Sequence, residues 1–155
     1  MRQLQTNTPG SLYLHSMPGR YEPMAQFISD LQLLKINRIV CLTAADEILC
    51  KSPVYLDAIK SGKFATEHTV FPIPDFGVPD DVEAFYALAQ DVVELLRNGQ
   101  NNLVHCAGGI GRTGMFAGCV LNILGQPLEA LRDSGSYPET AAQREVVHLA
   151  QLHSG

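Results

Sequence analysis

The residues with the clearest capacity for chemistry lie in one short segment, residues 105–114, which read H-C-A-G-G-I-G-R-T-G. Cys106 stands six positions before Arg112, and three glycines lie between them. A strand-like run precedes this segment and a helical run follows it. A glycine-rich loop at such a junction can turn its backbone N–H groups toward one point, at the positive end of the helix. The segment therefore predicts a binding site for a phosphate-sized anion.

The same arrangement would make the cysteine a nucleophile. The planar guanidinium of Arg112 can bind the anion through two parallel N–H groups. The sulfur of Cys106 would then lie under the phosphorus. A free thiol titrates near 8.5, but a helix N-terminus and an adjacent guanidinium can lower a thiol pKa to roughly 3.5–7.5. Because the thiolate is the attacking form, the segment predicts phosphoryl transfer to Cys106, followed by hydrolysis of the thiophosphate. The alternative for Cys106 alone is a buried structural cysteine at a strand end.

A second segment offers a proton donor. Residues 74–80 read P-D-F-G-V-P-D, a loop punctuated by proline and glycine after a strand-like run. The leaving oxygen of a phosphate ester needs a proton, which Cys106 cannot supply as a thiolate. An exposed aspartate is normally ionised at pH 7, but a bound phosphate dianion would favour its protonated form. We therefore predict that Asp75 is the general acid; a turn-forming aspartate is the alternative. Asp80 and Asp81 are predicted helix caps, and either one is an alternative candidate for the general acid.

Composition excludes several classes of function. The chain has 155 residues, 46% hydrophobic and 17% charged, the profile of one globular domain over residues 1–155. A net charge of −5 argues against binding to nucleic acid or to an anionic membrane, and no apolar run reaches the length of a membrane span. Four scattered cysteines and the histidine spacing predict neither disulfides nor a metal site, and we expect no cofactor. A monomer in the reducing cytoplasm is the expected setting.

Strand-like and helical patterns alternate along the chain. The predicted strands are residues 11–15, 38–43, 69–73 and 103–106, and the predicted helices are 22–35, two short helices within 46–62, 80–98, 113–124, 128–133 and 140–153. This alternation predicts an α/β domain with a central, mostly parallel twisted sheet and helices on both faces. Ligands bind such sheets beyond the carboxyl ends of the strands, where both the glycine loop and the Asp75 loop fall.

Together these motifs resemble the signature of the cysteine-dependent tyrosine and dual-specificity phosphatases. His-Cys, five residues and Arg-Thr-Gly match the nucleophile loop, and P-D-F-G-V-P is similar to the mobile acid loop of the tyrosine-specific enzymes, with Ile73 where they usually have tryptophan. The order of elements is similar to the kinase-associated phosphatase branch, which shares L-x-x-x-P-G (residues 14–19), Gly-Gly inside the loop and an acid on D-x-G-x-P-D.

The resemblance implies roles for further residues. Thr113 would hydrogen-bond the cysteine sulfur and help it leave, and His105 would support the loop. Residues E-T-A-A-Q at 139–143 are similar to the loop whose glutamine positions the attacking water, so Gln143 takes that role by resemblance, with an outward residue at a helix start as the alternative. The backbone of the loop between Cys106 and Arg112 would bind the phosphate, together with Arg112 itself: Ala107, Gly108, Gly109, Ile110 and Gly111.

The expected activity is dephosphorylation of phosphotyrosine, with phosphoserine or phosphothreonine as further substrates, in proteins or peptides. Phosphate-like oxyanions such as vanadate and tungstate should inhibit it. The alternatives are the same chemistry on an inositol phosphate, a lipid head group or an RNA 5′ end, a phosphate-binding module without turnover, and a sulfur- or arsenate-handling enzyme. The absence of lysine from residues 107–111 disfavours highly charged substrates.

Two smaller questions stay open in the sequence. Arg20 and Tyr21 lie either at the rim of the pocket or on an exposed turn. Cys41, Cys50 and Cys119 are candidates for a redox partner of Cys106, although Cys41 and Cys119 stand in apolar runs typical of a core. His68 is expected on a polar surface.

Overall fold

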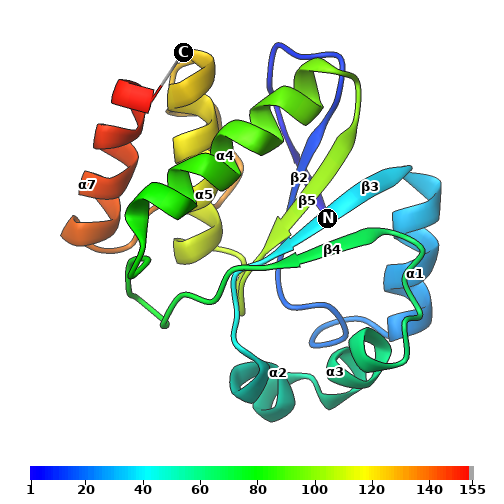
Figure 1. The fold of residues 1–155 in the computed structure, drawn as a ribbon. Coiled ribbons are helices and arrows are strands. Elements are labelled where there is room, and N and C mark those ends of the chain that lie inside the picture. Colours follow the sequence, from blue (N-terminus) through cyan, green and yellow to red (C-terminus); the bar gives the residue numbers. More distant parts are fainter. Residues whose placement is uncertain (154–155) are drawn as a thin grey trace.

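A computed structural model describes residues 1–153 as a five-stranded sheet with helices on both of its faces (Figure 1). The strand order is β1-β2-β5-β3-β4. Strands β2, β5, β3 and β4 are parallel, and β1 pairs antiparallel with β2 at one edge. The strands are β1 (Arg2–Leu4), β2 (Leu12–His15), β3 (Ile36–Cys41), β4 (Glu67–Val70) and β5 (Asn101–His105). The predicted α/β fold with a mostly parallel sheet is confirmed.

The helices divide between the two faces of the sheet. Helices α4 and α5 cover one face, with α7 packed on the outer side of α5, and α1 covers the other face (Figure 1). The helices are α1 (Met24–Leu33), α2 (Ala45–Lys51), α3 (Pro53–Lys60), α4 (Val82–Arg97), α5 (Gly111–Leu124), α6 (Glu129–Asp133) and α7 (Ala141–Leu149), followed by a 3₁₀ turn, Ala150–His153. No helix among the described residues has the length and apolar character needed to cross a membrane.

The central strands are apolar on both sides because both faces of the sheet are covered. Ile39 and Leu103 pack with α1, whereas their neighbours Val40 and Val104 belong to the larger core under α4 and α5. This alternation is the two-residue period of a strand, and it fixes the register. With the register fixed, Cys41 lies opposite His105 at the carboxyl ends of β3 and β5.

Most predicted elements begin or end within about two residues of the observed ones, and three larger differences concern β1, β4 and α7. Strand β1 was not predicted, because three residues at an edge carry too short a pattern. The strand expected at 69–73 runs instead from Glu67 to Val70, although the N–H groups of Phe71 and Ile73 still donate to the carbonyls of Cys41 and Leu42. Pro72 and Pro74 have no N–H to donate, so regular pairing stops there. The helix predicted at 140–153 ends its α-helical part at Leu149.

Candidate active site

The loop after β5 carries Cys106 at the floor of a cavity of about 290 Å³. Cys106 is only 3% exposed, and the hydroxyl of Thr113 donates to its sulfur over 3.1 Å. Gly109 adopts φ 77°, and a Cβ there would lie 2.7 Å from the carbonyl oxygen of His15. Only glycine fits this position without strain, so the tight curl of the loop depends on it.

Contacts from outside hold the loop carbonyls away from the cavity. The carbonyl of Ala107 accepts from the N–H of Met17 (3.0 Å) and that of Ile110 accepts from the N–H of Tyr137 (3.1 Å). The carbonyl of Gly109 accepts from the Ser136 hydroxyl (2.6 Å) and from a guanidinium nitrogen of Arg2 (2.8 Å). With these carbonyls bound outward, the N–H groups of the loop are free to face an anion.

Arg112 is almost fully buried and fixed by two neighbouring segments. Its two terminal nitrogens donate to the Glu47 carboxylate over 2.7 and 2.8 Å, and Nη1 also donates to the carbonyl of Ile73 over 2.8 Å. These hydrogen bonds lower the pKa of Glu47 to about 2, although burial opposes the shift. Burial would lower the pKa of Arg112, but the bonds to Glu47 and the charges of Cys106 and Asp75 raise it instead. The guanidinium of Arg112 therefore stays charged and keeps a fixed orientation in the wall of the cavity.

Asp75 lies at the mouth of the same cavity. It follows β4 on the predicted loop, its side chain is about half exposed, and Oδ1 lies 3.4 Å from Nη2 of Arg112. Its neighbour Phe76 has φ 60°, uncommon for a residue with a side chain, and is exposed at the cavity mouth. Cys106, Arg112 and Asp75, which arrive from three segments, therefore share one cavity.

His105 and Gln143 lie outside the cavity lining, in buried hydrogen-bond networks. The Nδ1 atom of His105 lies 3.0 Å from the carbonyl oxygen of Cys106, and Nε2 lies 2.7 Å from the hydroxyl of Tyr55. Gln143 is fully buried: its amide donates to the carbonyl of Gly77 (3.0 Å) and accepts from the N–H of Glu139 (2.7 Å). Gln143 thereby ties α7 to the acid loop in this structure. Its predicted role in orienting water stays a prediction.

Several residues around the site were not identified from the sequence. Glu47 and Lys51 lie one helical turn apart on α2 and form an ion pair of 2.9 Å, and Lys51 lines the cavity with Glu139. No local motif marks Glu47, because an acidic residue is expected in the first turn of any helix.

Arg20 and Tyr21 lie at the rim of the cavity, which is one of the two positions that the sequence left open for them. The Arg20 guanidinium lies 4.9 Å from the centre of the Tyr21 ring.

We expect Glu47→Gln to weaken both activity and stability. Glutamine keeps one acceptor oxygen but loses the charge and the second acceptor, and its NH₂ group would face a guanidinium nitrogen, which should destabilise the fold by about 1–3 kcal/mol at pH 7. Because the pKa of Glu47 is lowered in the folded state from its ordinary 4.5 to about 2, the stabilising pair is present above pH 4.5 and is lost as pH falls through about 2.

Thermal unfolding from pH 7 down to pH 2 would check this prediction. The difference in unfolding temperature between wild type and Glu47→Gln should become smaller as the pH approaches 2. A gap that is independent of pH would mean that the charge of Glu47 does not stabilise the protein. Glu67→Gln, at an exposed position on the edge strand β4, is the matched control and should leave stability unchanged.

Comparisons with known proteins agree with this geometry. The family model described as the Swiss Army Knife protein DSP-PTPase phosphatase domain matches residues 1–155. Cyclin-dependent kinase inhibitor 3 of Rattus norvegicus is 33% identical over 141 residues, which cover 83% of this chain and 65% of the rat protein. The Homo sapiens protein of the same name is 32% identical over 87 residues, 52% of this chain and 40% of its own length. The chain thus spans less than two thirds of these relatives.

Two solved structures show the same fold. A kinase-associated phosphatase whose catalytic cysteine is replaced by serine has a TM-score of 0.80 at 23% identity, covering 99% of this chain and 94% of its own. The active form of the phosphatase Tk-PTP has a TM-score of 0.71 at 24% identity, covering 97% of each chain. From the full-length family match and the nucleophile loop, we conclude that this chain belongs to the DSP-PTPase phosphatase domain family of cysteine-dependent phosphatases.

Proposed function

We propose that the protein hydrolyses phosphate monoesters on proteins, with phosphotyrosine as the preferred substrate and phosphoserine and phosphothreonine as further ones. One observation carries this proposal. The nucleophile Cys106, the fixed guanidinium of Arg112 and the exposed carboxyl group of Asp75 all line one cavity of about 290 Å³. Tyr21 and Phe76 are exposed at its rim and offer aromatic faces to a phenyl ring.

The first chemical step transfers the phosphoryl group to the enzyme. The thiolate of Cys106 attacks phosphorus, the bond from phosphorus to the ester oxygen breaks, and Asp75 gives its proton to that oxygen as the alcohol or phenol leaves. Arg112 and the loop N–H groups bind the three equatorial oxygens, where charge accumulates.

The second step regenerates the enzyme. Water attacks phosphorus, Asp75 takes a proton from that water, and the sulfur–phosphorus bond breaks to release inorganic phosphate. The sulfur leaves as a thiolate, and the hydroxyl of Thr113, 3.1 Å from it, donates to the charge that develops. Both steps are complete with groups of this chain and one water molecule.

A reducing compartment such as the cytoplasm suits this chemistry, because the nucleophile must be reduced. Within the described residues all four cysteines are free thiols. Vanadate and tungstate should compete with substrate for the loop, and a chelator should not lower turnover. Strong loss of activity with a chelator would contradict the mechanism.

Substrate choice can be measured directly. We expect a higher kcat/KM for a phosphotyrosine peptide than for the matching phosphothreonine peptide, because the longer side chain reaches Cys106 past the aromatic rim. An inositol phosphate should be a poor substrate. If the inositol phosphate were turned over faster than either peptide, the protein-substrate assignment would be wrong.

A further inference from the structure

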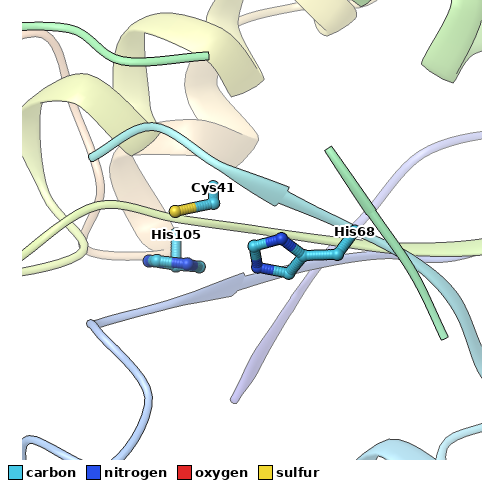
Figure 2. A group of neighbouring side chains, drawn as sticks. All are labelled: Cys41, His68 and His105. Atoms are coloured by element: carbon cyan, nitrogen blue, oxygen red, sulfur yellow. The ribbon is translucent and has the colours of Figure 1, made fainter. Parts of the chain in front are cut away.

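A second cluster of reactive side chains lies behind the nucleophile loop, on three neighbouring strands. Cys41 ends β3, His68 is on β4 and His105 ends β5. Their donor atoms, one sulfur and two imidazole nitrogens, all lie within 4.8 Å of one another. Figure 2 shows the sulfur of Cys41 beside the His105 ring, with the His68 ring turned toward both. Cys41 and His105 are buried, whereas His68, expected on a polar surface, is partly buried on the edge strand.

The three donors form a set that zinc prefers. Thiolate and imidazole are its usual ligands in proteins, at about 2.3 Å and about 2.0–2.1 Å. Tetrahedral coordination at these distances places ligand atoms roughly 3.3–3.6 Å apart. Movements of about 1 Å would close the present cluster around an ion. The edge strand β4 carries His68, whose partial exposure gives the cluster a side open to solvent.

Hydrogen bonds orient His105 for this role. Its Nδ1 faces the carbonyl oxygen of Cys106 at 3.0 Å, so that nitrogen carries the proton, a tautomer assigned from this geometry. Its Nε2 then carries the lone pair, which accepts a hydrogen bond from the Tyr55 hydroxyl at 2.7 Å. Metal-binding histidines commonly have this arrangement, in which the second ring nitrogen donates to a backbone carbonyl.

Tyr55 holds the two histidines in the absence of an ion. Its hydroxyl lies 2.7 Å from the Nε2 atoms of both His68 and His105. An ion would have to move it aside and replace its two hydrogen bonds with coordinate bonds.

We propose that Cys41, His68 and His105 form a zinc-binding site behind the nucleophile loop, with the hydroxyl of Tyr55 as its competitor. The site is distinct from the phosphate cavity, and it does not depend on the proposed phosphatase activity. It contacts the loop through His105, which bonds the carbonyl of Cys106.

Cobalt can report this site, because tetrahedral Co²⁺ bound by a thiolate absorbs in the visible and near-ultraviolet range. The experiment uses the Cys106→Ser protein, so that the catalytic sulfur cannot bind the metal. One equivalent of Co²⁺ should produce the thiolate bands, and Zn²⁺ should abolish them. Cys50→Ser is the matched control, because Cys50 is exposed on α2 and outside the cluster.

Three further variants in the same background complete the test. Cys41→Ala and His68→Gln should each lose the bands, with circular dichroism confirming that the proteins are folded. Tyr55→Phe keeps all three ligands and removes two competing hydrogen bonds, so it should bind Co²⁺ about tenfold more tightly. Absent bands, bands that persist without Cys41 or His68, or weaker binding by Tyr55→Phe would each overturn the proposal.

Discussion

Replacing Cys106 with serine is expected to abolish turnover of an aryl phosphate, a loss of roughly 10⁴-fold or more, as when other enzymes lose their nucleophile. A serine hydroxyl at this position stays protonated and is a weak nucleophile. The substitution changes one atom, and Thr113 can still hydrogen-bond the new oxygen. The loop N–H groups and Arg112 remain, so the variant should still bind phosphate or vanadate, which calorimetry can measure.

Two controls separate chemistry from folding. Cys50→Ser makes the same atomic change at an exposed position on α2 and should retain turnover. Alkylation of the wild-type protein with iodoacetamide at neutral pH should modify Cys106 and inactivate it, and vanadate should protect it. Residual turnover within tenfold of wild type in Cys106→Ser would exclude a cysteinyl-phosphate intermediate.

The part of the site that the sequence predicted is the part encoded locally. The loop from Cys106 to Arg112 is contiguous, and its conformation follows from the glycines and from the helix that begins at Gly111. The position of Asp75 could also be predicted, because carboxyl ends of parallel strands share one edge of the sheet. In both cases a short stretch of sequence is enough to predict where the residue lies, although contacts from distant segments complete the loop.

The partners of these residues come from distant segments and could not be predicted in the same way. Glu47 meets Arg112 across 65 positions of sequence, and Arg2 reaches Gly109 across 107. Each looks like an ordinary surface charge until the fold brings it to the loop. The pairing depends on helix placement and strand register, which no local pattern of residues records.

The proposed zinc-binding cluster was not predicted from the sequence, for the same reason. Cys41, His68 and His105 have no regular spacing in the sequence, and the expectation of no metal site rested on that spacing. They meet because β3 lies between β4 and β5, and because the register puts their side chains on one face. Metal sites built across a sheet carry their pattern in the register of the strands, whereas those within a loop or helix carry it in the sequence.

Asp75→Ala is expected to lower kcat by roughly 10²–10⁴-fold for esters with poor leaving groups, the usual contribution of a general acid. Alkyl phosphates and phosphotyrosine belong to this class. An aryl phosphate with a strongly electron-withdrawing ring should lose far less, because its phenolate leaves without a proton. The structure supports this division: Asp75 lies at the mouth of the cavity, where a leaving group would exit, whereas the nucleophile lies at its floor.

The measurement is a plot of log kcat against the pKa of the leaving group for wild type and variant. The wild-type line should be nearly flat, and the Asp75→Ala line should fall steeply as the leaving group becomes more basic. Asp80→Ala is the matched control, because Asp80 is exposed on the same loop and the aspartate that lines the cavity is Asp75. Parallel lines for wild type and Asp75→Ala would show that Asp75 is not the donor, and a steep line for Asp80→Ala would assign the proton to Asp80.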